Sequence, residues 1–212
     1  MLTALRADGL LAVVRARGAA RAEAMAHALV AGGLRVIELT LTTPGVLGSV
    51  ERLRSALPAG VLVGVGSVRT PADARQACAA GAEFLVSPHA DPALVAAMLA
   101  TGLPALPGVL TPTEVAGALD AGAQAVKLFP ASTVGPRHLR ALRGPFPGLV
   151  VVPTGGIALA DADSWFRAGA AAIGAGSELT GVGDDLDVAA LERQARAWRA
   201  RIDALVAQPQ PT

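Results

Sequence analysis

The segment DAGAQAVKLFP (120–130) completes an alanine-rich helical pattern, passes through a glycine and continues as a short β-type run. A glycine is favoured just past a helix C-terminus because it adopts the left-handed conformation without strain. The same arrangement recurs in AGGLRVIELTL (31–41), AAGAEFLVSP (79–88), ATGLPALPG (100–108) and RAGAAAIGAGS (167–177). The run after each glycine is short and mostly apolar, which is typical of parallel strands buried on both faces.

Three more apolar runs complete a set of eight candidate strands; they lie at 10–15, 61–66 and 149–154. Helices are predicted between the strands, and three of them have clear beginnings. Thr70, Asp91 and Thr111 each precede a proline, so a capping side chain stands before a proline at the first helical position. Alternating strands and helices indicate right-handed crossovers and a parallel sheet.

Eight such units predict an α/β protein with a single-domain (β/α)8 TIM barrel and short loops over residues 1–207. A proline-bearing polar tail at 208–212 is expected to be disordered. A doubly wound open sheet is the architectural alternative. It has less support because GVGSVR (64–69) and GAGSEL (174–179) both lack the third glycine of the dinucleotide-binding fingerprint.

Composition limits the classes of function. The 212 residues are 52% hydrophobic and 17% charged, with a net charge of +1 and no charged block, so a basic groove for nucleic acid has no support. No apolar stretch reaches the ~18 residues of a membrane span, and no membrane partner is expected. One cysteine cannot form an internal disulfide. We therefore expect a cytoplasmic protein.

Two charged residues stand inside predicted core strands. Lys127, in AVKLF (125–129), is the only lysine among 18 basic residues, and Glu38 lies in VIEL (36–39). A buried charge without a partner costs several kcal/mol, so the two groups are expected to compensate each other. They form either a structural ion pair or an amine nucleophile beside an acid/base group. Only an amine can attack a ketone and become an imine, since guanidinium stays protonated, and this favours Schiff-base chemistry at Lys127.

Glycine-rich turns follow the last two predicted strands. Thr154-Gly155-Gly156 and Gly174-Ala175-Gly176-Ser177 offer bare backbone N–H groups where barrels of this type commonly bind phosphate. Together they predict a phosphate site. A zinc triad is not expected, because only His89 of the three histidines lies near the active face, and no metal or other cofactor is expected.

The motifs resemble those of the 2-keto-3-deoxy-6-phosphogluconate (KDPG) aldolases, which are class I pyruvate-type lyases. The resemblance runs in order along nearly the whole chain and is most specific at KLFP (127–130) and TGG (154–156). It implies a trimeric (β/α)8 barrel of carbohydrate metabolism that needs no metal. It also implies a small-molecule substrate, a phosphorylated 2-keto-3-deoxy sugar acid, which is cleaved to pyruvate and glyceraldehyde 3-phosphate.

The resemblance assigns roles to individual residues. Lys127 corresponds to the Schiff-base lysine and Glu38 to the general acid/base that works through a water. Ser67 would bind the pyruvyl moiety, and Thr154 would add a hydroxyl donor to the substrate-binding site. Pro88, Pro107 and Phe129 would shape the pocket, and Gly155, Gly156, Gly176 and Ser177 would hold the phosphate. Many members have arginine at the position of Thr42, and here Arg15 is a substitute for binding the substrate carboxylate.

Three alternatives stay open. The same chemistry acts on the galactonate epimer in some relatives and on unphosphorylated 4-hydroxy-2-oxoglutarate in others. A different class is a barrel without catalytic use that serves as a trimeric assembly module. Such a module would expose an added apolar patch, whereas an aldolase would trap pyruvate covalently at Lys127.

Overall fold

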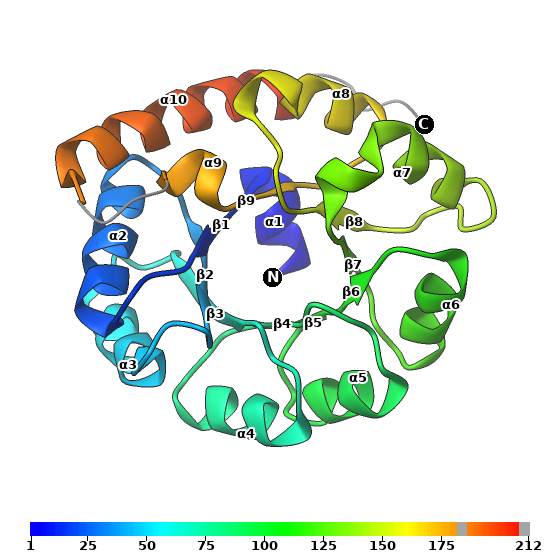
Figure 1. The fold of residues 1–212 in the computed structure, drawn as a ribbon, viewed down its shortest axis with the longest axis horizontal. Coiled ribbons are helices and arrows are strands. Elements are labelled where there is room, and N and C mark those ends of the chain that lie inside the picture. The colour runs from blue at the N-terminus through cyan, green and yellow to red at the C-terminus, as the bar shows by residue number, and fades with distance from the viewer. Residues whose placement is uncertain (182–185, 208–212) are drawn as a thin grey trace.

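The glycine-terminated repeats fold into parallel strands that are joined by helices, as the sequence predicts. The protein is described from a computed structural model that covers residues 1–181 and 186–207, so the tail expected at 208–212 lies outside the described residues. Figure 1 shows the strands around a common centre with most of the helices outside them.

The described elements alternate along the chain. The strands are β1 (Leu10–Val14), β2 (Val36–Thr40), β3 (Leu62–Gly66), β4 (Leu85–Val86), β5 (Ala105–Leu106), β6 (Gly108–Val109), β7 (Val126–Leu128), β8 (Val151–Pro153) and β9 (Ile173–Ala175). The α-helices are α1 (Leu2–Asp8), α2 (Ala19–Ala31), α3 (Val46–Ala56), α4 (Pro71–Ala79), α5 (Pro92–Leu99), α6 (Pro112–Asp120), α7 (Gly135–Arg143), α8 (Ala162–Arg167), α9 (Ser177–Thr180) and α10 (Val188–Val206). Two 3-10 helices are η1 (Ala131–Thr133) and η2 (Leu159–Asp161).

The predicted helix beginnings are confirmed by their capping bonds. The Thr70 hydroxyl accepts the backbone N–H of Asp73, whose carboxylate accepts the N–H of Thr70 in return. Thr111 and Glu114 form the same reciprocal box at α6. The Asp91 side chain accepts a backbone N–H at α5. Each cap satisfies a helix donor that would otherwise lack a partner.

All strand pairings are parallel, and they form two sheets. One has the order β5-β4-β3-β2-β1-β9, and the other has the order β6-β7-β8. The sequence predicts one strand within 100–108, whereas the structure has two, β5 and β6, on either side of Pro107. A proline has no N–H to give to a ladder, which explains the interruption. The result is an α/β fold with a curled parallel sheet.

The space that the strands enclose has an apolar level at their amino ends and a polar level at their carboxyl ends. At the amino ends, an apolar cluster fills the space; its members are Leu5, Leu11, Val36, Phe84, Val86, Leu106, Ala125, Val152 and Ala172. Leu5 belongs to α1, which the sequence patterns did not predict and which lies across the centre in Figure 1. Gly64 makes room for Phe84, since a Cβ there would collide with the ring. This end is therefore closed by packed side chains.

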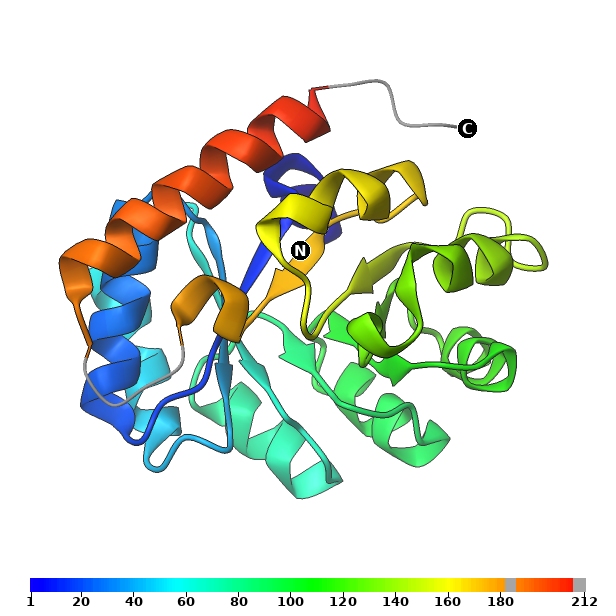
Figure 2. The ribbon, with the colours of Figure 1, turned by 45° about the horizontal axis from the view of Figure 1, so that its top comes forward.

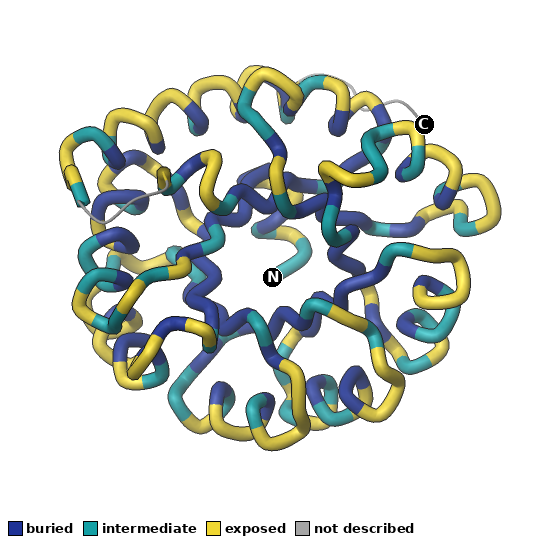
Figure 3. Tube along the Cα trace, viewed as in Figure 1, coloured by how far each residue is buried: buried dark blue, intermediate teal, exposed yellow. Residues whose placement is uncertain are grey.

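Burial follows the same plan around the molecule. Figure 3 shows buried strands at the centre and helices whose outer faces are exposed. Val188 is the large hydrophobic side chain that stands exposed within 1–181 and 186–207. Over the same residues, none of the helices has both the length and the apolar character that crossing a membrane requires. Large apolar side chains are therefore nearly all buried or half-buried in this part of the chain.

Candidate active site

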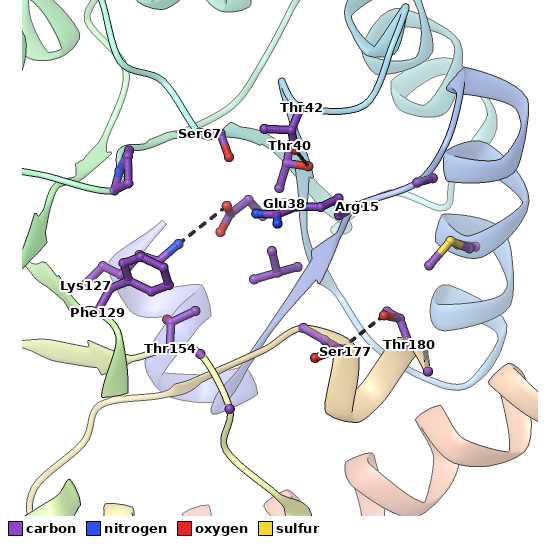
Figure 4. A pocket seen from close by; sticks show the side chains of 18 of the residues that line it. Arg15, Glu38, Thr40, Thr42, Ser67, Lys127, Phe129, Thr154, Ser177 and Thr180 are labelled. Atoms are coloured by element: carbon purple, nitrogen blue, oxygen red, sulfur yellow. Dashed lines mark hydrogen bonds and ion pairs between the residues drawn. The ribbon is translucent and has the colours of Figure 1, made fainter. Parts of the chain in front are cut away.

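The carboxyl ends of the strands surround a cavity of about 610 Å³. Eleven of the twelve predicted site residues line it: Lys127, Glu38, Arg15, Ser67, Pro88, Phe129, Thr154, Gly155, Gly156, Gly176 and Ser177. They come from nearly every strand end, as expected where parallel strands converge on one site. Figure 4 shows the labelled side chains gathered around this space.

Lys127 and Glu38 face each other in the interior. Lys127, on β7, is 6% exposed, and Glu38, on β2, is 1% exposed. The Lys127 Nζ lies 3.7 Å from the Glu38 Oε1, which is too long for a hydrogen bond but close enough for an ion pair (Figure 4). The Nζ also lies 5.2 Å from the centroid of the Phe129 ring. The predicted pair of buried charges is therefore present.

The pair is incompletely satisfied. The buried Oε2 of Glu38 has no hydrogen-bond partner in the described part of the protein. A buried ion pair that serves only structure is stable when its remaining lone pairs are occupied. A carboxylate that lines a cavity beside an amine instead suits proton transfer to a bound molecule or water. This arrangement favours the catalytic interpretation over the structural one.

Inward-facing glycines create the space for these polar groups. A Cβ at Gly66 of β3 would collide with the Glu38 carboxylate, and one at Gly174 of β9 would collide with the Thr154 side chain. Thr154 is itself held by a hydroxyl bond to the carbonyl of Val152, at 3.2 Å. The polar layer thus depends on positions where the neighbouring strand has no side chain.

The variant Gly66→Ala tests this dependence. The added methyl displaces the Glu38 carboxylate, so we expect turnover to fall at least tenfold and unfolding free energy to drop by about 1–3 kcal/mol. Gly117→Ala is the matched control, because nothing lies within 4 Å of a Cβ at that position of α6. It should raise stability by about 0.5–1 kcal/mol. Turnover is measured in cleavage assays and unfolding free energy in urea melts. Equal turnover and equal stability of the two variants would contradict the role of Gly66.

Ser67 has an unusual backbone at the end of β3. Its φ is 60°, and among the described residues it is the non-glycine residue with positive φ. Such a conformation is unfavourable for a side chain with Cβ and tends to occur at functional sites. Pro88 and Phe129 also line the cavity and contribute apolar surface to it. Their position fits the expected contact with a small keto acid.

Arg15 follows β1 and directs its side chain into the cavity, toward Glu38 (Figure 4). Its role in binding the substrate carboxylate stays a prediction. Thr42 also lines the cavity. It stands where the resemblance to the KDPG aldolases places an arginine in many members. Its hydroxyl lies 2.9 Å from that of Thr40, so this side offers hydroxyls in place of a guanidinium.

The glycine turns after β8 and β9 form one rim of the cavity. Gly155 and Gly156 have φ values of 99° and 68°, a region that favours glycine. The Gly155 carbonyl accepts the N–H of Ser132 at 3.0 Å, which ties this turn to η1. Gly176 and Ser177 begin the short helix α9 on the adjoining side. An isolated parallel bridge between Thr154 and Gly174 brings the two turns together.

Pro107 differs from its expected place. It is buried and does not belong to the cavity lining in the described part of the chain. Its carbonyl instead accepts the backbone N–H of Lys127 at 2.8 Å. Pro107 therefore contacts the chain that carries the lysine and lies behind the pocket wall.

Several lining residues were not predicted. They are Val13, Ala16, Arg17, Arg21, Met25, Thr40, Thr180 and Gly181. Three of these, Arg17, Arg21 and Met25, belong to the loop after β1 and to α2. The signal available in the sequence was the second arginine in RAR (15–17). Across the described ranges, no group of three or more His, Cys, Asp or Glu side chains is arranged to hold a metal ion.

Comparisons with known proteins agree with this geometry. The family model described as KDPG and KHG aldolase matches residues 2–193. A probable 2-dehydro-3-deoxy-6-phosphogalactonate aldolase of Rhizobium meliloti is 35% identical over 80% of this chain and 81% of its own length. A 2-dehydro-3-deoxy-phosphogluconate aldolase of Treponema pallidum is 42% identical over 64% of each chain. The crystal structure of the Zymomonas mobilis KDPG aldolase with 3-phosphoglycerate is 31% identical, with a TM-score of 0.87 over 97% of each chain.

A curled parallel sheet with a buried lysine–glutamate pair and these relatives define a carbon–carbon lyase of the aldolase type. The match covers most of the chain, and structural neighbours agree with it along nearly their whole length. The chain belongs to the KDPG and KHG aldolase family.

Proposed function

We propose that the protein is a class I aldolase that cleaves 2-keto-3-deoxy-6-phosphogluconate to pyruvate and glyceraldehyde 3-phosphate. The observation that carries the proposal is the buried Lys127 Nζ, 3.7 Å from the carboxylate of Glu38 in the wall of the cavity. The glycine turns on the opposite rim support a phosphorylated substrate, and the Zymomonas relative was solved with 3-phosphoglycerate.

The proposed reaction uses the chain's own groups at each step. The Lys127 Nζ attacks the C2 carbonyl of the keto acid, and loss of water gives an iminium that withdraws electrons from C3. Glu38, through a water, takes the proton of the C4 hydroxyl. The C3–C4 bond then breaks, which releases glyceraldehyde 3-phosphate and leaves a pyruvate enamine. Protonation of that enamine and hydrolysis of the iminium free pyruvate and return the amine.

The other cavity residues orient the substrate in this proposal. Arg15 binds the carboxylate through its two-pronged guanidinium, and the Ser67 hydroxyl contacts the pyruvyl group. Phe129 and Pro88 pack against the three-carbon unit. The phosphate lies against Gly155, Gly156, Gly176 and Ser177, which places the sugar acid between two anion-binding ends.

We further propose the finer features of the architecture. The Thr154–Gly174 bridge, with β5 and β6 acting as one strand bent at Pro107, supports closure of the two sheets into an eight-stranded (β/α)8 barrel over residues 1–207. A homotrimer in the cytoplasm follows from the family resemblance, and the free thiol of Cys78 needs no oxidising compartment. Mass photometry at working concentration tests the trimer directly.

The test of function compares three substrates under one assay. We expect cleavage of 2-keto-3-deoxy-6-phosphogluconate, measured as pyruvate release, to exceed that of 4-hydroxy-2-oxoglutarate in kcat/KM. The galactonate epimer is the second candidate substrate, because a relative of 35% identity bears that name. Failure to release pyruvate from all three, together with no borohydride-trapped pyruvate adduct, would refute the proposal.

Arg15→Ala tests the carboxylate contact. Loss of a charge-assisted hydrogen bond of about 1.5–3 kcal/mol should raise the apparent KM for the keto acid by at least tenfold. Arg15→Lys keeps the charge without the two-pronged geometry, so its apparent KM is expected to lie between those of the wild type and Arg15→Ala. An unchanged KM in Arg15→Ala would place the carboxylate elsewhere, for example at the Thr40–Thr42 side of the cavity.

A further inference from the structure

The described lining of the cavity carries more cationic than anionic side chains. Its ionisable lining residues in the described ranges are four cations, Arg15, Arg17, Arg21 and Lys127, against the single carboxylate of Glu38. The whole chain has a net charge of only +1. A concave site with one sign of charge attracts ligands of the opposite sign. Two of these cations, Arg17 and Arg21, have no role in the proposed reaction so far.

Arg21 stands in the first turn of α2. It is the third residue of α2, whose first turn holds no acidic side chain and whose N-cap, Gly18, makes no side-chain capping bond. The amino end of a helix carries partial positive charge, so a cation there costs a few tenths of a kcal/mol. A residue that breaks a local rule and also lines a cavity suggests a function for its charge.

The phosphate turns themselves supply no charged side chain. Gly155, Gly156 and Gly176 offer backbone N–H groups, and Ser177 offers a hydroxyl, all of them neutral donors. Helix α9 has only four residues, so its dipole is small. Neutral donors alone leave a phosphate dianion without a counter-charge. The charge has to come from another wall of the cavity.

The fold brings the arginines to that side. Helix α9 packs against β1 and β9, and α10 packs against both α2 and α9. Figures 1 and 2 both show α9 on the side of the sheet where β1 runs toward α2. Thr180 and Gly181, at the end of α9, line the same cavity as Arg17 and Arg21.

We propose that Arg17 and Arg21 bind the terminal phosphate from the α2 side and determine the preference for phosphorylated over unphosphorylated keto acids. The inference rests on the proposed function and adds its specificity-determining residues. Arg15 neutralises the carboxylate at the inner end, while Arg17 and Arg21 neutralise the dianion at the outer end.

The experiment measures kcat/KM for 2-keto-3-deoxy-6-phosphogluconate and for its unphosphorylated counterpart, 2-keto-3-deoxygluconate, with enzyme in excess so that slow cleavage is measured. Arg17→Gln and Arg21→Gln are compared singly and together. The matched control is Arg75→Gln with Arg201→Gln, two exposed arginines on α4 and α10 that lie outside the cavity lining. Circular dichroism melts report whether each variant folds.

We expect the double variant to lose at least tenfold in the ratio of the two kcat/KM values, with cleavage of the unphosphorylated substrate changed less than threefold. The control pair should leave the ratio unchanged. A ratio within threefold of the wild type, or an equal loss on both substrates, would overturn the inference. Borohydride trapping of pyruvate at Lys127 separates the two proposals: a wild type that traps and cleaves keeps the proposed function even if the ratio does not move.

Discussion

Lys127→Met is expected to abolish both cleavage and covalent trapping. The chain has no other lysine, so no second side-chain amine replaces the lost nucleophile. Removing a nucleophile of this kind lowers kcat by on the order of 10⁴- to 10⁶-fold. Incubation with pyruvate and borohydride, followed by intact mass measurement, should show one reduced pyruvate on the wild type and none on the variant.

Lys127→Arg separates loss of chemistry from loss of the ion pair. Arginine keeps a positive charge near Glu38 but cannot form an imine. Lys127→Met removes the charge and leaves a buried carboxylate without its partner, which costs stability. We therefore expect both variants to be inactive and Lys127→Arg to be the more stable in urea. Measurable turnover by either variant would contradict Schiff-base catalysis at this residue.

Glu38→Gln is expected to lose about 10²- to 10⁴-fold in kcat, the range for removal of a general acid/base. The amide occupies nearly the same volume between Gly66 and Lys127 but cannot take up and return a proton as a carboxylate can. Imine formation should persist at a reduced rate, since the nucleophile is intact. The measurement pairs single-turnover cleavage with the yield of trapped pyruvate.

Glu51→Gln is the control for this variant, because Glu51 is exposed on α3. It removes the same charge and should keep wild-type kinetics. If Glu38→Gln cleaved the keto acid at the wild-type rate, the carboxylate would have no part in the mechanism and its pairing with Lys127 would be structural. A variant that loses trapping as completely as Lys127→Met would point to a role in imine formation itself.

The sequence was sufficient to predict the buried lysine–glutamate pair and the class of fold. Lys127 and Glu38 are polar residues in strands that must be buried, and parallel strands bring their carboxyl ends together. The caps at Thr70, Asp91 and Thr111 were equally local features, readable from a side chain and the proline after it. These predictions depend on short-range chemistry that a single segment expresses completely.

Other features depend on contacts between distant segments. Pro107 accounts for the break itself, but no local pattern specifies that β5 pairs with β4 while β6 pairs with β7. Helix α1 has only seven residues, of which Leu5 and Asp8 are buried, and this is too little for a periodicity signal. Arg17 and Arg21 resembled ordinary surface arginines until the fold placed them in the cavity lining. Such positions follow from tertiary packing.

The apolar plug at the amino ends of the strands has a kinetic consequence. Because Leu5 and its neighbours close that end, substrate and both products must use the mouth at the carboxyl ends. In the proposed reaction pyruvate stays covalently held at the deeper end, while the phosphorylated aldehyde occupies the mouth. The aldehyde must therefore depart before the keto acid, and in the synthetic direction pyruvate must enter first. In the cleavage direction, pyruvate should then inhibit competitively with respect to the keto-acid substrate. The aldehyde should inhibit noncompetitively with respect to the same substrate.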